Sequence, residues 1–389
     1  MQNGEIVASH YATQQGVRLR WRDGLIDSIE PTDAPPDRWL APALLDLQVN
    51  GYAGIDFQSD SLTLEQALHA MRNLRQAGCA RVFPTLVTAP WPAMLTRLHK
   101  FRELCGQSPE LKTAVAGWHI EGPFLSPVPG FHGAHDPAVM LDPTPARIKE
   151  LREAAGSDCV LLTLAAERPG ATEAIALAVS LGITVSIGHS DASAADLEHA
   201  ARAGATSFTH LGNGCPQQLD RHNNILWRVI ERPELIAGII PDRIHVSPAL
   251  FRVLHRQLPQ ERIWYTTDAV SPAGSPPGRF RMGRIEVEVG PDQVVREPGK
   301  TNFAGSALRP LDGVIRAAQM LGRQWQQVWD NMSSVPAQMV GMDLALAPGK
   351  EATFCVIQTR EDNSIVAGST YVRGVAEELR IVPQPPSPA

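Results

Sequence analysis

Residues 183–213, ITVSIGHSDASAADLEHAARAGATSFTHLGN, combine two kinds of hydrophobic pattern. The runs ITVSIGHS and ATSFTHLGN are short, apolar and rich in β-branched residues, which is typical of buried strands. Between them, residues 192–204 carry apolar side chains at helical spacing. A strand–helix–strand unit of this kind predicts parallel strands, and the two strands are followed by His189 and His210.

The same alternation continues on both sides of this unit. Helical periodicity is found at 63–78, 144–156, 171–182 and 247–258, and β-rich runs are found at 79–88, 159–167 and 262–269. So many alternating units in about 300 residues favour a closed barrel over an open sheet. We therefore predict an α/β protein built on a (β/α)8 TIM-type barrel. Strand-like segments flank it at both ends: GVRLRW, LIDSIE, EATFCVIQT and STYVRGVAE.

The composition excludes several classes of protein. The chain has 389 residues, 43% of them hydrophobic, which is enough for one large core and a smaller one. Its net charge is −6, and it has no Lys/Arg run that would follow a phosphate backbone, so no nucleic-acid partner is expected. Five cysteines, none in a CxxC pair, fit a reducing compartment. With neither a signal-peptide pattern nor an apolar stretch long enough for a membrane span, a soluble cytoplasmic protein is expected.

Polar side chains recur at the carboxyl ends of the predicted strands. They are Asp46, Gln48, Asn50, Glu121, His189, His210 and Asp268. Any one of them alone is better explained as a loop residue or a hydrogen-bonded core histidine. On successive strands of a barrel, however, such residues meet on one rim, where barrel enzymes build their active sites.

Three of these residues make a ligand set for one divalent metal ion: Glu121, His189 and His210. Two imidazoles and a carboxylate are typical of catalytic zinc sites with an open fourth position, although Fe, Co and Mn accept the same ligands. Asp268, on the last strand, is then the expected general base. A binuclear centre bridged by a carboxylated lysine is disfavoured. Gln48 and Asn50 are poor ligands on the first strand, and none of the five lysines ends a strand.

Seven motifs follow one another along almost the whole chain: DLQVNGYAGIDF, HIEGPF, GAHDP, SIGHSDAS, THLGN, TTDAVSPAG and LAPGKEA. Together they resemble the N-acetylglucosamine-6-phosphate deacetylases of the amidohydrolase superfamily. The resemblance implies a homodimer that hydrolyses the acetamide of an N-acetyl amino sugar, giving acetate and a free amine. It also implies two domains, a small β-sandwich formed by both termini (1–42 plus 348–389) and a metal-dependent barrel (43–347).

Carried over residue by residue, the resemblance implies the same three metal ligands and the same catalytic aspartate. The QxN pair Gln48 and Asn50 resembles the single-metal branch of the family. His135 in GAHDP matches the histidine that contacts the acetamide and the sugar, although a loop-capping role explains it equally well. His132 is a substitute candidate beside it.

Further substrate contacts are implied on two other loops. His245 in PDRIHV matches a substrate-binding histidine of the family. Asn213, with Gly214 beside it, matches an asparagine whose loop backbone approaches the phosphate.

The phosphate-binding region departs from the family pattern. The family's HLFNAMP and the REPG turn after it correspond here to HLGNGCPQQLDRHNN, so Gly212 replaces an aromatic residue. Arg221 is the candidate phosphate ligand, with His222 beside it, because guanidinium binds phosphate in a bidentate way. A solvated loop arginine explains Arg221 nearly as well. Arg243 in DRIH stands where the family has glycine, and it either adds positive charge or narrows the pocket.

We expect a metal-dependent hydrolase that deacetylates an N-acetyl hexosamine, with N-acetylglucosamine 6-phosphate as the first candidate. The altered rim also fits a non-phosphorylated sugar, another N-acyl amine or a cyclic amide. A non-catalytic barrel used for ligand sensing or assembly is disfavoured, because the metal ligands and Asp268 are all retained.

Overall fold

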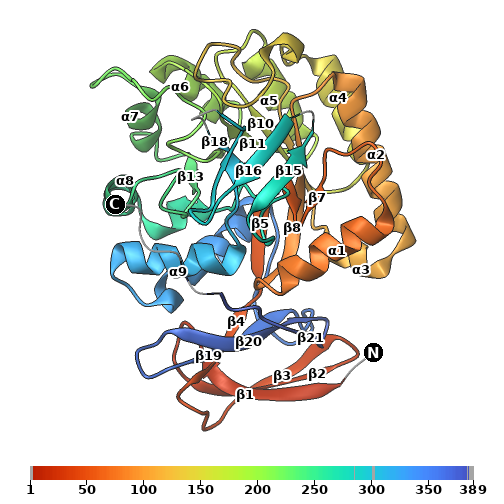
Figure 1. The fold of residues 1–389 in the computed structure, drawn as a ribbon, viewed down its shortest axis with the longest axis vertical. Helices are drawn as coiled ribbons and strands as arrows, with labels where there is room; N and C mark the ends of the chain where they lie inside the picture. Colours follow the sequence, from red (N-terminus) through yellow and green to blue (C-terminus); the bar gives the residue numbers. More distant parts are fainter. Residues whose placement is uncertain (1–2, 284, 300–302, 383, 385–389) are drawn as a thin grey trace.

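The computed structural model describes residues 3–283, 285–299, 303–382 and 384. Eight parallel strands form its central sheet, and Figure 1 shows helices on both sides of it. In sheet order the strands are β5 (Leu44–Val49), β8 (Cys79–Val87), β9 (Trp118–Glu121), β10 (Val160–Leu164), β11 (Thr184–Ile187), β12 (Ser207–Phe208), β13 (Ile236–Ile239) and β14 (Ile263–Tyr265).

The sheet closes where the chain leaving β14 meets β5. Val49 forms a parallel bridge with Ala269, and the Asn50 N–H donates to the Ala269 carbonyl at 2.7 Å. Closure leaves no exposed sheet edge, and it brings the carboxyl ends of all eight strands onto one rim. The predicted (β/α)8 barrel is confirmed.

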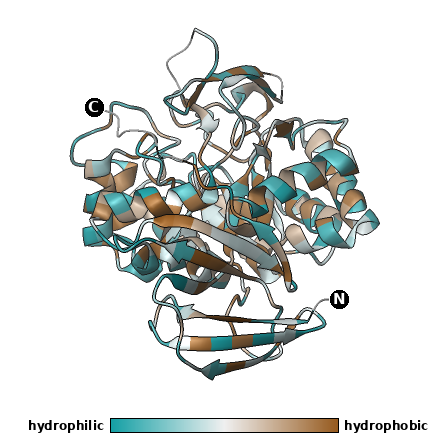
Figure 2. Ribbon diagram, turned by 60° about the horizontal axis from the view of Figure 1, so that its bottom comes forward, coloured by the Kyte–Doolittle hydropathy of each residue, from teal (hydrophilic) through white to brown (hydrophobic). Residues whose placement is uncertain are grey.

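The helices begin at capping residues that are visible in the sequence. Ser193 and Asp196 form a capping box at the start of α6, and Thr63 and Gln66 form another at α1. Figure 2 shows both hydrophobic and hydrophilic residues along these helices, as expected for elements that cover a barrel. The helices are α1 (Leu64–Arg75), α2 (Trp91–Gln107), α3 (Pro109–Ala114), α4 (Pro145–Ala155), α5 (Ala171–Ser180), α6 (Ala194–Arg202), α7 (Ile225–Ile230), α8 (Pro248–Gln257), α9 (Pro310–Leu321) and α10 (Ser334–Met339).

Both ends of the chain build one separate seven-stranded sheet (Figure 1). Its core includes Leu19, Trp21 and Phe354. A small domain built from both termini was predicted, and the division into 1–42 plus 348–389 and 43–347 stays a proposal. The strands of this sheet, in order, are β3 (Leu25–Pro31), β2 (Gly16–Arg22), β1 (Gly4–His10), β4 (Arg38–Pro42), β19 (Phe354–Thr359), β20 (Ile365–Val372) and β21 (Val375–Glu378).

A four-stranded antiparallel sheet is inserted between β14 and α9, and no such sheet was predicted from the sequence. Its strands are β15 (Gly278–Met282), β16 (Ile285–Val289), β17 (Val294–Arg296) and β18 (Phe303–Ser306). The alternation in RFRMGRIEVEV is the signal that could have revealed this insertion. Nowhere in the described part of the chain is a helix both long and apolar enough to cross a membrane.

Asp46 stabilises the closure of the barrel through buried hydrogen bonds. Its carboxylate accepts the hydroxyls of Thr266 at 2.5 Å and Thr267 at 2.6 Å, and the Thr267 and Gln48 N–H groups at 3.2 Å each. Burial raises the pKa of Asp46 to about 6, even though these hydrogen bonds act in the opposite direction. The first and last strands are therefore joined by a buried polar contact directly before Asp268.

Replacing Asp46 with alanine is expected to lower the free energy of unfolding by about 2–4 kcal/mol, because buried donors lose their acceptor. Urea unfolding measures this loss. Asp27→Ala, at an exposed position on β3, is the matched control and is expected to change the stability by less than about 0.5 kcal/mol. Equal stability of the two variants would contradict a clamping role for Asp46.

Candidate metal centre and active site

Three side chains converge above the ends of three strands of the barrel. Glu121 ends β9, whereas His189 and His210 lie two residues beyond the ends of β11 and β12. One ligand atom from each lies within 4.8 Å of the others, and all three residues are buried. His210 Nε2 is 2.9 Å and His189 Nε2 is 3.5 Å from Glu121 Oε1. This donor set fits a single divalent ion with an open coordination position.

The imidazole of His189 is oriented by contacts from a neighbouring loop. Its Nδ1 lies 2.8 Å from the Phe131 carbonyl, which fixes the proton on Nδ1 and leaves Nε2 directed at Glu121. Gly214 adopts φ +62°, and a Cβ there would lie 2.9 Å from the His189 ring. A glycine is therefore required where this loop passes over His189.

Three site residues hold an uncommon backbone conformation. His189, His210 and Asp268 have φ values of +49°, +34° and +50°, in the left-handed region that non-glycine residues rarely adopt. Such conformations persist where the surrounding structure imposes them, and they concentrate at functional sites. Here they occur where the chain turns away from β11, β12 and β14.

The charge of Glu121 dominates the electrostatics of the cluster. Burial alone would raise the pKa of Glu121, but hydrogen bonds from His189 and His210 hold it well below its usual range. Conversely, burial opposes protonation of His210, but the hydrogen bond and charge of Glu121 outweigh this and raise its pKa. The carboxylate is thus ionised and ready to bind a cation.

Asp268 lies beside this cluster and is held by Asn50. The Asn50 amide donates to Asp268 Oδ1 at 2.7 Å. Burial and the negative charge of Glu121 raise the pKa of Asp268 to about 7. A cation bound to Glu121 would offset the negative charge of Glu121 and so lower the pKa of Asp268. Gln48 donates to Glu121 Oε1 at 2.9 Å, so each member of the QxN pair supports one carboxylate.

The structure brings His135 into the cluster. Its ring centroid is 4.5 Å from that of His189, and its Nε2 lies 3.9 Å from Glu121 Oε2. Burial and the charge of His189 lower the pKa of His135 to about 3, so its imidazole is neutral at neutral pH. His132 is partly exposed in the same loop.

His245 lies in the loop after β13. Its Nδ1 is 2.6 Å from Asp242 Oδ2. Burial opposes protonation of His245, but the charge of Asp242 outweighs it and raises the pKa. The Phe303 ring lies 5.1 Å from the His245 ring, centroid to centroid.

The predicted phosphate contacts are more scattered. Asn213 is half-buried three residues after His210, to whose carbonyl its N–H donates. Arg221 and His222 are exposed, and their backbone groups bond within the segment 220–227. Arg243 adopts φ +69° and donates to Gln319 of α9. The structure thus joins the Asn213 backbone to that of the metal ligand His210, whereas Arg221 bonds within its own loop and Arg243 bonds to α9.

A chain of buried polar side chains inside the barrel was not predicted from the sequence. His119 Nε2 is 2.7 Å from Thr163 Oγ1, which is 2.8 Å from Thr209 Oγ1. Thr209 in turn is 2.7 Å from Ser186 Oγ. Because His119 precedes Glu121 by two residues on one strand, both side chains point to the same face. The sequence did contain a signal for this hydrogen-bonded chain, because His119 is a polar residue two positions before the strand-end ligand Glu121.

Comparison with known proteins gives relatives along most of the chain, although no protein-family model matches. The chain is 33% identical over 353 residues to the N-acetylglucosamine-6-phosphate deacetylase of Bos taurus, covering 86% of this chain and 82% of that protein. It is 30% identical over 349 residues to the N-acetylgalactosamine-6-phosphate deacetylase of Escherichia coli O157:H7, covering 88% and 90%. Among solved structures, the N-acetylglucosamine-6-phosphate deacetylase of Pasteurella multocida superposes with a TM-score of 0.82 at 26% identity, covering 95% and 98%. The likeness extends over the barrel and the terminal sheet.

Proposed function

The chain belongs to the N-acetylglucosamine-6-phosphate deacetylases of the amidohydrolase superfamily, and on that premise we propose that it hydrolyses the acetamide of N-acetylglucosamine 6-phosphate. The products are acetate and the free amino sugar phosphate. The observation that carries this proposal is the buried cluster of Glu121, His189 and His210 with Asp268 beside it.

We assign one divalent metal ion to Glu121, His189 and His210, with zinc favoured and Fe, Co or Mn also compatible with these ligands. When bound, the ion supplies Lewis acidity to the substrate carbonyl and to the attacking water. Glu121 provides the negative charge of the metal site. The hydrogen bond between His189 Nδ1 and the Phe131 carbonyl keeps the His189 imidazole in the orientation that directs its Nε2 at the metal position.

Asp268 moves the proton in the proposed reaction. Asn50 occupies its Oδ1, so the second carboxylate oxygen remains to accept a proton from the attacking water. The same oxygen then returns that proton to the nitrogen of the amino sugar as the C–N bond breaks. A pKa raised by burial suits a group that both takes and releases a proton near neutral pH.

The neighbouring histidines and the loop after His210 position the substrate in this proposal. A neutral His135 can donate a hydrogen bond to the acetamide oxygen, where negative charge develops. His245, which is held in place by Asp242, contacts the sugar. Asn213 and Gly214 present a backbone turn beside the metal ligands, and this turn faces the phosphate end.

The 6-phosphate is the part of the proposal that needs the most direct test. Acetate release should be measured with N-acetylglucosamine 6-phosphate, the same sugar without phosphate, and N-acetylgalactosamine 6-phosphate, which the Escherichia coli relative's name suggests as a second candidate. We expect kcat/KM to be roughly tenfold to a hundredfold higher for a phosphorylated sugar, because charge-assisted contacts to Arg221 or Arg243 would be lost without phosphate.

Arginine variants identify the source of that preference. Arg221→Gln and Arg243→Gln are compared with Arg202→Gln, which changes an exposed arginine on α6. If kcat/KM falls for the phosphorylated sugar alone in Arg221→Gln or in Arg243→Gln, the arginine replaced in that variant binds the phosphate. Equal activity on both sugars in the unmodified protein would instead favour a non-phosphorylated N-acyl substrate.

We further propose a homodimer in the cytoplasm. The five cysteines are all free thiols, as expected in a reducing compartment. The dimer follows the family resemblance, and sedimentation velocity of the purified protein measures it directly. A monomer at micromolar concentration would overturn that part of the proposal.

A further inference from the structure

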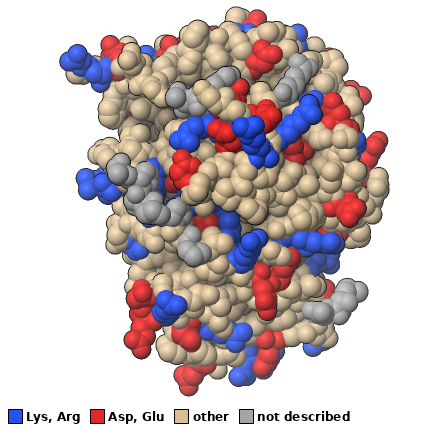
Figure 3. All heavy atoms as spheres, in the orientation of Figure 1, with Lys and Arg blue, Asp and Glu red and all other residues tan. Residues whose placement is uncertain are grey.

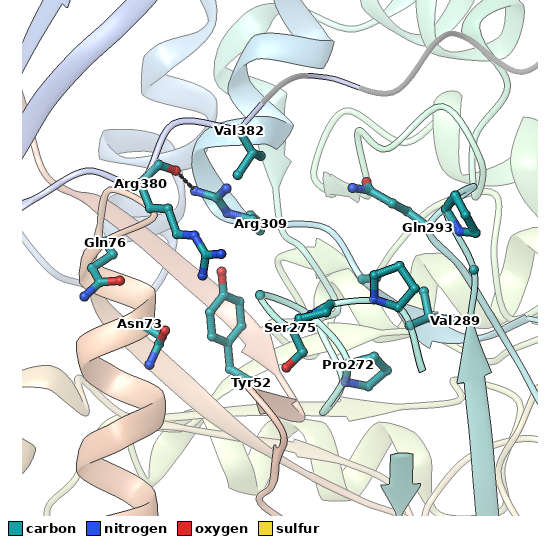
Figure 4. Close-up of a pocket in the computed structure, with 16 residues that line it drawn as sticks. Tyr52, Asn73, Gln76, Pro272, Ser275, Val289, Gln293, Arg309, Arg380 and Val382 are labelled. Carbon is teal, nitrogen blue, oxygen red and sulfur yellow. Dashed lines mark hydrogen bonds between the residues drawn. The ribbon is translucent and has the colours of Figure 1, made fainter. Parts of the chain in front are cut away.

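A cavity lies apart from the metal cluster. Its volume is about 310 Å³, at the lower end of the range for small-molecule pockets. Figure 4 shows it enclosed by residues from α1, the loop after Asp268, the inserted sheet and the C-terminal segment. None of the metal ligands lines it, and neither does Asp268.

The cavity is lined by cations and hydrogen-bond donors. Arg309 and Arg380 both line it, and the described lining residues include no Asp or Glu. By contrast, Figure 3 shows basic and acidic side chains interspersed over the face that it displays, so positive charge is not a general property of that surface. Arg309 Nε lies 3.8 Å from the buried Asp312 carboxylate, which offsets part of this charge, and the positive charge that remains favours an anion inside the cavity.

Two buried polar side chains, Arg309 and Tyr52, lie next to each other at the wall of the cavity. Arg309 is only 8% exposed, and its Nη1 makes no hydrogen bond to a described residue, although Nη2 donates to the Arg380 carbonyl. The Tyr52 hydroxyl is buried next to this guanidinium: burial raises the pKa of Tyr52, whereas the charge and hydrogen bonding of Arg309 act against that rise. In Figure 4 this hydroxyl points toward the two guanidinium groups. Buried polar groups are normally satisfied, so Arg309 Nη1, which makes no hydrogen bond to a described residue, leaves a donor available to a ligand at this wall of the cavity.

Other lining residues suit the organic part of a ligand. Asn73 and Gln76 offer amides on one side, and Pro272, Val289 and other apolar residues line another. Helix α9 begins directly after Arg309, so the positive end of its dipole lies at the cavity wall. A phosphate against the arginines and a small hydroxylated skeleton against the amides would use all of these features.

We propose that this cavity is a binding site for a small organic phosphate, separate from the catalytic site. Its walls continue into the segments that carry Asn50 and Asp268, because Ala53 N–H donates to the Ala273 carbonyl at 2.7 Å and Gly54 N–H to that of Ser271 at 2.8 Å. Occupancy of the cavity would therefore stabilise the loop that follows Asp268.

Isothermal titration calorimetry with glucose 6-phosphate tests the proposal on the intact protein. Arg380→Gln is the principal variant because Arg380 is exposed, so the fold should tolerate the change, and Tyr52→Phe removes only the hydroxyl that lies next to Arg309. We expect each to raise the Kd of one binding event, Arg380→Gln by roughly tenfold or more. Arg373→Gln, an exposed arginine outside the cavity, is the matched control and should leave the Kd unchanged.

Three results would overturn the proposal. The first is that neither cavity variant changes the binding of glucose 6-phosphate, which would mean that the cavity holds only water. The second is that inorganic phosphate binds as tightly as glucose 6-phosphate, which would mean that the site recognises an anion and not the organic part of the ligand. The third is that glucose binds equally well, which would exclude a role for the phosphate. Because no turnover is measured, these results do not depend on the deacetylase assay.

Discussion

Replacing Asp268 with asparagine is expected to lower kcat by about a thousandfold or more, because the variant can neither accept nor return the proton. Asparagine has nearly the same shape, and its carbonyl oxygen can still accept the hydrogen bond from Asn50. The metal ligands are untouched. Steady-state acetate release measures the loss, while circular dichroism and metal analysis should match those of the unmodified protein.

Asp292→Asn is the matched control for this experiment. Asp292 is an exposed aspartate in the inserted sheet, and the same change there should leave kcat within about twofold, as expected for a surface substitution. If Asp268→Asn retained the activity of the control, Asp268 would not transfer the proton. If instead it lost both metal and activity, the residue would belong with the ligands.

Replacing His210 with asparagine is expected to remove most of the bound metal and to lower activity by at least about a hundredfold. His210 makes the shortest contact in the ligand cluster, 2.9 Å from its Nε2 to Glu121 Oε1. Its loss leaves two ligands, too few for a stable divalent site. Metal content by plasma emission spectrometry is measured on the same samples as acetate release.

His99→Asn serves as the control, since His99 is exposed on α2. Chelator treatment of the unmodified protein should reproduce the loss seen in His210→Asn, and adding Zn²⁺ should restore only the unmodified protein. Full metal occupancy in His210→Asn would contradict the ligand assignment, whatever the activity.

Much of the barrel was predictable because each strand–helix unit is a local pattern. The segment around His189 shows this, since the apolar run of β11, the capping box of α6 and the next strand follow one another within a few residues. Strand-end polar residues were equally visible, and the structure brings Glu121, His189 and His210 together. The inserted sheet β15–β18 was missed although its alternation is also local.

The supports of the site were harder to predict because their partners are distant in sequence. Asp46 bonds to Thr267 across the closure of the barrel, and nothing near Asp46 indicates that partner. The positive φ of His189 was equally hidden, because the conformation is imposed by tertiary contacts rather than by a glycine. The orientation of Arg243 toward Gln319 likewise depends on the packing of α9.

The terminal sheet has a consequence for how the protein is made. Its β4 pairs with β19, with Leu40 opposite Val356, so about 300 residues of barrel separate two neighbouring strands. At the usual pace of a ribosome, roughly 15 to 60 seconds pass between their syntheses. During that interval the β4 edge of β1–β4 stays open, and an open edge invites pairing with other chains. Timely folding of the barrel, which delivers β19 to that edge, therefore protects the nascent chain from aggregation.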